Sequence, residues 1–227
     1  MSNTSITKEV FNFLNTLKEN NDREWFTENK KRFKATETVV KSVFQAIYEN
    51  VQEHDDIERL KTFRIYRDVR FSHDKTPYKV NFSAGLSRSG VQLRGGYYIH
   101  IQPKGSFIAA GFWAPNKEDL LRIRKEWELD ASELRDILAN KNFQKTWGEL
   151  TGDGVKTAPK GFSKEDPNID LIRKKQFILV KNFNDKAVMD PKFATEVSEA
   201  FKQVRPFFDL MSNILTTDLN GASVIGQ

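Results

Sequence analysis

Residues 97–113 read YYIHIQPKGSFIAAGFW, and this stretch decides the class of fold. Aromatic and aliphatic residues dominate on both sides of Pro103-Lys104-Gly105, a tripeptide with the chemistry of a hairpin turn. Two such runs joined by a short turn are typical of neighbouring antiparallel strands. We therefore predict a β-hairpin over these residues.

Further strand patterns precede this hairpin and follow it. In residues 63–72 the odd positions are apolar except for Arg67, and residues 79–86 alternate again, as expected for strands with one face on a core. Residues 176–182 include four consecutive apolar residues, which are consistent with a strand buried on both faces. We predict an antiparallel sheet of four or more strands, from about residues 62–113 plus 176–182.

Helical patterns flank the predicted sheet. Before residue 60, apolar residues recur at helical spacing around residues 10–17 and 36–52, and Asn21 with Glu24 resembles a capping box. After residue 190 the spacing predicts a long helix that is kinked or broken at Pro206, because proline lacks the N–H that a helix interior needs. The sheet is therefore expected to pack against N-terminal and C-terminal helices in an α+β fold.

Composition limits the class of protein. Neither a linker nor an internal repeat is visible in the 227 residues, so we expect a single α+β domain over residues 1–216 and a frayed tail at residues 217–227. Eighteen Phe and four Trp predict a packed core. The absence of cysteine excludes disulfides and favours the cytoplasm. No apolar stretch is long enough to span a membrane, and the N-terminus lacks a secretion signal, so we expect no membrane association.

Positive charge is concentrated in the predicted sheet. Residues 61–104 contain nine Lys or Arg and two acidic residues, a local balance of +7, whereas the whole chain carries +5. The rest of the protein therefore sums to −2. Basic residues gathered on a sheet face or its loops indicate a site for an anion.

The most basic part of this region also carries a resemblance. Residues 64–79 read RIYRDVRFSHDKTPYK, and GYYIH follows at residues 96–100 and PKGF at residues 159–162. The chain is similar in these motifs, and in the order of its elements, to the family known as domain of unknown function 2461. The resemblance implies an α+β fold and marks residues 64–79 as the signature of the family. It implies no substrate.

Alternating spacing places Arg64, Asp68 and Arg70 on the polar face of one predicted strand. Asp68 between two guanidinium groups would hold them as a preformed clamp for phosphate or carboxylate. The alternative is an ion network on a solvated face, which contributes little stability. Arg67 points toward the predicted core, where it needs either a buried acid such as Glu24 or Glu28 or a ligand.

The turn after this strand supplies further candidates. Lys75, Tyr78 and Lys79 surround Pro77 and would lean over a bound anion, unless they form a charged hairpin tip with Tyr78 packed beneath it. The predicted ligand-binding residues are Arg64, Arg67, Arg70, Lys75, Tyr78 and Lys79. His100 shares a sheet face with Tyr98 and would serve, with Asp68, as a candidate for acid or base catalysis.

Three functions remain open at this point. The leading hypothesis is a domain that binds an anionic ligand, either nucleic acid or a phosphorylated metabolite. The second is a metal-independent enzyme that acts on a phosphoryl or carboxylate substrate, with Asp68 or His100 moving a proton. The third is an interaction protein in which the signature is purely structural. Three histidines without helical pairing indicate no metal site, and no motif indicates a cofactor.

Overall fold

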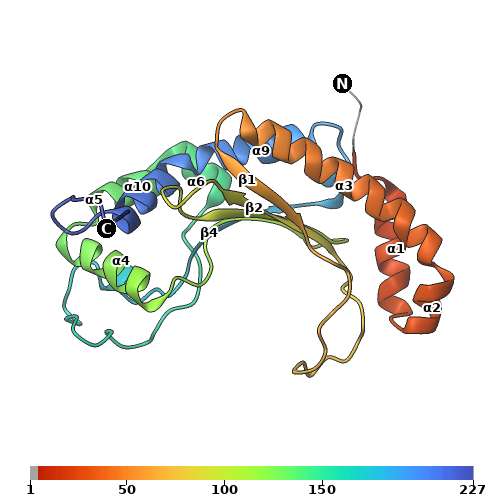
Figure 1. The fold of residues 1–227 in the computed structure, drawn as a ribbon, viewed down its shortest axis with the longest axis horizontal. Helices are drawn as coiled ribbons and strands as arrows, with labels where there is room; N and C mark the ends of the chain where they lie inside the picture. The colour runs from red at the N-terminus through yellow and green to blue at the C-terminus, as the bar shows by residue number, and fades with distance from the viewer. Residues whose placement is uncertain (1–4, 227) are drawn as a thin grey trace. The chain divides into compact units, whose positions relative to one another are not determined.

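The structure is a computed structural model that describes residues 5–226, within which the chain forms ten helices and five strands (Figure 1). The helices are α1 (Lys8–Glu19), α2 (Arg23–Glu28), α3 (Lys30–Gln52), α4 (Lys117–Leu129), α5 (Ser132–Ala139), α6 (Lys141–Trp147), α7 (Ile169–Ile172), α8 (Asp185–Val188), α9 (Phe193–Gln203) and α10 (Arg205–Thr216). The strands are β1 (Ile57–Thr62), β2 (Phe82–Arg88), β3 (Gly96–Ile101), β4 (Ser106–Phe112) and β5 (Phe177–Phe183).

The five strands form one antiparallel sheet in the order β1-β2-β3-β4-β5, which confirms the predicted α+β fold. The hairpin of β3 and β4 turns at Lys104, whose φ of 58° is the left-handed value that such a turn requires. Burial alternates along β3, and β5 starts with three buried residues, as the apolar run predicted.

The predicted strand at residues 63–72 is wrong. The first strand is β1, which ends at Thr62, and residues 63–81 form a long loop between β1 and β2 (Figure 1). An isolated bridge between Tyr66 and Tyr78, and a hydrogen bond from Phe63 N to Ser83 O at 2.9 Å, pair the two ends of this loop. Phe71, predicted to face the core, is 95% exposed. Alternation alone does not make a strand, because the backbone also needs a partner for its N–H and C=O groups.

The chain divides into two compact units. Unit 1 comprises Met1–Leu86, Tyr98–Ile108 and Asn182–Glu199, and unit 2 comprises Ser87–Tyr97, Ala109–Lys181 and Ala200–Gln227. Whether the units fold separately depends on their individual stability. The single domain over residues 1–216 and the frayed tail at residues 217–227 therefore stay predictions.

Unit 1 has an aromatic core under its first three helices. Helix α3 packs against both α1 and β1. Phe26 of α2 and Phe33 of α3 lie 5.1 Å apart between ring centroids, and Phe33 stacks on Phe82 of β2 at 6.2 Å. All three rings are buried. This cluster anchors the second end of the loop at residues 63–81 to the helices, since Phe82 directly follows it.

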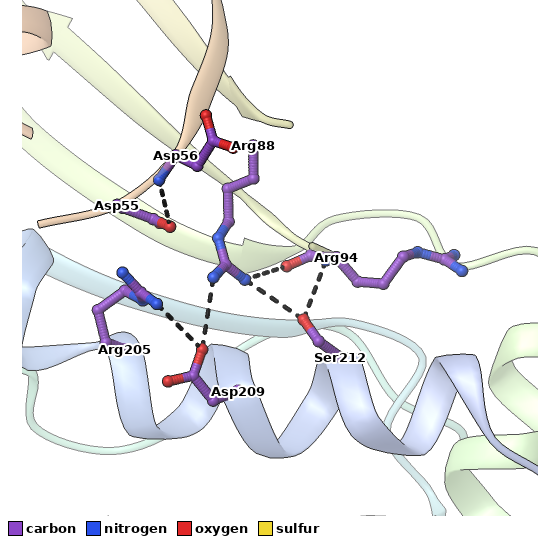
Figure 2. A network of polar contacts seen from close by, with 7 residues as sticks. All are labelled: Asp55, Asp56, Arg88, Arg94, Arg205, Asp209 and Ser212. Atoms are coloured by element: carbon purple, nitrogen blue, oxygen red, sulfur yellow. Dashed lines mark hydrogen bonds and ion pairs between the residues drawn. The ribbon is translucent and has the colours of Figure 1, made fainter. Parts of the chain in front are cut away.

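Unit 2 has its own core, in which helix α4 contacts α7 and α10. Trp127 of α4 meets Phe177 edge to face at 4.8 Å. The side chain of Arg88 is fully buried, and it donates to the carbonyl of Arg94 at 2.9 Å and to the hydroxyl of Ser212 at 3.3 Å (Figure 2). Hydrogen bonds to these oxygens satisfy a guanidinium that would otherwise be costly to bury.

Two helix boundaries differ in detail from the sequence patterns. The cap of α2 is Asp22, whose carboxylate accepts from the Trp25 amide at 2.8 Å, so the predicted capping box at Asn21 is wrong by one residue. The predicted break at Pro206 is confirmed, because α9 ends at Gln203 and Pro206 lies in the first turn of α10. No helix among the described residues is both long and apolar enough to cross a membrane.

Candidate functional site

The family-signature run lies in the loop between β1 and β2, which we call the signature loop (residues 63–81). The bridge between Tyr66 and Tyr78 is extended by hydrogen bonds from Arg67 N to Pro77 O at 2.9 Å and from Lys79 N to Ile65 O at 2.8 Å. The two ends of the loop are thus paired over a few residues. Its middle, residues 68–76, makes no ladder hydrogen bonds.

Asn21 fixes the returning arm of this loop. Its side-chain amide donates to Tyr78 O at 2.9 Å, and its amide oxygen accepts from Tyr78 N at 3.1 Å. The Tyr78 ring stacks on Phe26 with centroids 3.9 Å apart, and Tyr78 is only 5% exposed. Burial raises the pKa of Tyr78. Tyr78 therefore packs beneath the loop, which agrees with the alternative prediction of a charged hairpin tip above a packed Tyr78.

Arg67 finds its acid within the loop. Its guanidinium pairs with Asp74 and donates to the Thr76 hydroxyl at 3.0 Å, so the expected pairing with Glu24 or Glu28 is wrong. Residues 68–76 fold back on Arg67 because Asp74 also accepts from the Thr76 amide at 3.0 Å, as acidic residues do in turns. This leaves part of the Arg67 fork for another partner, since a guanidinium carries five N–H donors.

The Asp74 carboxylate should make the order of this turn dependent on pH. Hydrogen bonds from the Thr76 amide and hydroxyl, and from Arg67, lower the pKa of Asp74 from 3.8 to about 2. Because the folded pKa lies below the unfolded one, the stabilisation is complete above pH 3.8 and is lost as the pH falls through about 2. We expect the Thr76 amide resonance in NMR spectra to titrate with a midpoint near pH 2. Asp74→Asn should abolish this titration, and a midpoint at the ordinary value would contradict the structure.

Arg70 and Asp68 form an exposed bidentate pair. The Arg70 Nε and Nη2 atoms lie 3.0 and 2.7 Å from the two carboxylate oxygens. Hydrogen bonds from the Arg70 side chain and amide, and the more distant charge of Arg64, lower the pKa of Asp68. Within residues 5–226, Asp68 hydrogen bonds to Arg70 and not to Arg64, so the predicted clamp with Asp68 holding two guanidinium groups is wrong. Arg64 is exposed and forms no hydrogen bond or ion pair with any residue in the described range 5–226.

A hollow lies beside the base of the signature loop. Its volume is about 490 Å³, and its lining comes from the loop, from β2 and from β3: Arg67, Asp68, Lys79, Val80, Asn81, Ser83 and Tyr98. Two of the six predicted ligand-binding residues, Arg67 and Lys79, meet here together with Asp68. Arg64, Arg70, Lys75 and Tyr78 are not in the lining.

Lys79 is the cation without an acidic partner in this hollow. It is half-buried, and its ammonium makes no ion pair or hydrogen bond with the residues that the structure describes. It lies 5.8 Å from the centre of the Phe63 ring. Burial, followed by repulsion from Arg64 and Arg67, lowers the pKa of Lys79. Like charges are therefore held close together at this point without full neutralisation.

A line of polar side chains runs from the hollow along β3. The Tyr98 hydroxyl lies 3.2 Å from Nδ1 of His100, and Nε2 of His100 lies 3.1 Å from the side-chain oxygen of Gln102. The imidazole stacks on Phe107 at 4.6 Å. Burial lowers the pKa of His100, and the hydrogen bond with Gln102 opposes this effect only in part. The lowered pKa favours the neutral ring at neutral pH. His100 is not part of the lining and contacts it through the Tyr98 hydroxyl.

Sequence reasoning missed several parts of this site. Lys75 donates to the carbonyl of Val69 at 3.0 Å and holds the loop rather than facing the hollow. Asn21 was assigned to a helix cap instead of the loop, and Asn81 and Ser83 were not singled out. Nothing in an isolated Asn or Ser indicates which distant segment it will meet. Among residues 5–226 no group of three or more His, Cys, Asp or Glu side chains is arranged to hold a metal ion.

Comparison with known proteins gives one family. No curated protein and no solved structure matches the chain. A family model described as a conserved hypothetical protein, DUF2461, matches residues 9–210, which include the signature loop and every residue that lines the hollow. The match covers most of the 227 residues. The chain therefore belongs to the conserved hypothetical protein family DUF2461.

Proposed function

We propose that the protein binds an anionic ligand, a nucleic acid or a phosphorylated small molecule, in the hollow beside the signature loop. The observation that carries this proposal is Lys79, which lies in the lining near two further cations, Arg64 and Arg67, and has no acidic partner among residues 5–226. Clustered cations repel one another. An anion that enters between them removes this repulsion and gains charge-assisted hydrogen bonds.

The donors around the hollow suit a phosphate group. Lys79 offers three N–H donors, and Arg67 keeps some of its five after pairing with Asp74 and Thr76. Asn81 and Ser83 add neutral hydrogen-bonding groups to the same lining. Asp68 is the one acid there, and Arg70 neutralises it from outside. The lining therefore keeps a positive balance.

Binding should depend on Lys79 more than on other lysines. We expect Lys79→Gln to weaken binding of inorganic pyrophosphate by about tenfold or more, because a hydrogen bond to a charged group contributes roughly 1.5–3 kcal/mol. Isothermal titration calorimetry at low salt measures this directly. The matched control is Lys192→Gln, which removes an exposed lysine from the same unit.

Two outcomes would overturn the proposal. One is an absence of binding by pyrophosphate and by oligonucleotides alike. The other is an equal loss of affinity in Lys79→Gln and Lys192→Gln, which would indicate attraction by the net charge alone. Melting temperatures of both variants check that neither has lost its fold.

A second candidate function is a metal-independent enzyme that acts on a phosphoryl substrate. The polar line from Tyr98 to His100 favours it, because Tyr98 belongs to the lining and its hydroxyl lies 3.2 Å from an imidazole nitrogen that can accept its proton. Turnover in a phosphatase and phosphodiesterase screen that is lost in both Tyr98→Phe and His100→Gln would support catalysis over binding. A purely structural role, the third hypothesis, predicts no ligand at all.

We also propose the cytoplasm as the compartment of the protein, because a chain without cysteine suits a reducing environment.

A further inference from the structure

We infer that the anionic ligand of the proposed function is a single-stranded nucleic acid, whose phosphates lie at the hollow while a base stacks on Phe71. This inference rests on the proposed function and narrows it. The observation behind it is the exposure of Phe71, which reaches 95% in the middle of a loop that carries five basic residues and two acidic ones. A partner that covers this ring removes apolar surface from water, which is favourable.

The surroundings of Phe71 match the needs of a nucleobase. The Arg70 guanidinium lies 6.0 Å from the centre of the Phe71 ring. Nearer the base of the loop, Tyr66 is 47% exposed, and its inner edge rests on Phe26 with ring centroids 5.8 Å apart. Aromatic rings interspersed with Arg are the surfaces on which single-stranded bases stack, because every base has a π-face.

Asp68 and Arg70 link the Phe71 ring to the hollow. Asp68 lines the hollow and holds Arg70 by two hydrogen bonds, and Arg70 precedes Phe71. A strand of nucleic acid that follows this path meets Lys79 and Arg67 first, then Arg70, then the exposed ring. Phosphate and base contacts alternate along such a polymer, as they do in sites for single strands.

Two other ligands fit the observations less well. A phosphorylated metabolite that fills the hollow leaves Phe71 uncovered, since Phe71 is not part of the lining. An anionic membrane attracts the same charges, but membrane-bound elements bury several apolar side chains together. Among the described residues of the signature loop, Phe71 is the single large apolar side chain that is more than half exposed.

Fluorescence anisotropy with a labelled thymidine oligonucleotide of about fifteen nucleotides tests this inference. We expect Phe71→Ala to weaken its binding by about 5-fold to 150-fold, the effect of losing one stacked base, and Phe71→Trp to retain it. Trp113→Ala is the matched control, because it removes another exposed aromatic ring, 70% exposed, from unit 2. An abasic oligonucleotide should bind wild type and Phe71→Ala equally.

The salt dependence and the competing ligands complete the test. For a single strand, log Kobs against log salt falls by about 0.7 for each phosphate contact, so Lys79→Gln should make this slope shallower by about that amount. If pyrophosphate binds but Phe71→Ala has the same affinity for the oligonucleotide as wild type, the inference is overturned while the proposed function stands. Phe71-dependent binding to vesicles with anionic lipid, without binding to the oligonucleotide, also overturns it. If neither pyrophosphate nor oligonucleotide binds, both proposals fail.

Discussion

Gly111→Ala should destabilise the protein by about 3 kcal/mol or more, although it adds a single methyl group. Gly111 lies in β4 with a φ of 142°, a conformation that residues with a side chain rarely adopt. A Cβ at this position would also overlap the backbone carbonyl of Phe177 at the start of β5. Backbone strain and steric overlap would therefore both lower the stability of the Gly111→Ala variant.

The neighbouring strand cannot move away cheaply from such a methyl group. Phe177 is fully buried and meets Trp127 of α4 edge to face, so a shift of β5 would disturb the core of unit 2. Urea unfolding followed by circular dichroism measures the loss as a lower midpoint at an unchanged slope.

Gly161→Ala separates the two causes. Gly161 has a φ of 87°, but a Cβ there meets nothing within 4 Å. We expect this variant to lose about 1 kcal/mol, from backbone strain alone. Equal losses in the two variants would show that the approach of Phe177 to Gly111 is less close than the structure places it.

Tyr78→Ala is expected to cost about 3–5 kcal/mol, comparable to the loss of a buried phenylalanine. Its ring stacks on Phe26 and touches Tyr66, with centroids 3.9 and 5.5 Å away. Removal of the ring leaves a cavity between α2 and the base of the signature loop. The loop should lose order with it, which hydrogen exchange of the Lys79 amide detects.

Tyr78→Phe distinguishes packing from ligand contact. The Tyr78 hydroxyl makes no hydrogen bond with any residue in the described part of the chain, so its removal should change the free energy of unfolding by less than about 1 kcal/mol. Affinity for pyrophosphate should also be unchanged. If Tyr78→Phe kept its stability but lost affinity, Tyr78 would contact the ligand, as one sequence hypothesis has it.

The elements that local patterns could reveal were predicted well. The spacing of apolar residues around 10–17 indicated α1, and α3 includes the predicted run at residues 36–52. The turn chemistry of Pro103-Lys104-Gly105 indicated the hairpin of β3 and β4. Such signals depend on residues close together in the sequence. The same rule explains the error at residues 63–72, where alternation is present but no partner strand lies alongside.

The candidate site was only partly accessible from the sequence. The basic run indicated a region for anions, and Arg67 and Lys79 do line one hollow. The partners of the arginines were mistaken, because the pairing of Arg67 with Asp74 depends on how a nine-residue segment folds back. Tyr98 entered the site from a different strand, which no spacing within the loop could indicate.

Composition and periodicity by themselves determined the α+β class, the helices at both ends and the location of the positive charge, since each arises from the chemistry of adjacent residues. The tertiary structure alone decided that Tyr78 is buried, that Phe71 is exposed and that Lys79 has no acidic partner within the described part of the chain. Burial and charge pairing are properties of side chains brought together from distant segments. Their energies depend on neighbours that only the folded chain supplies.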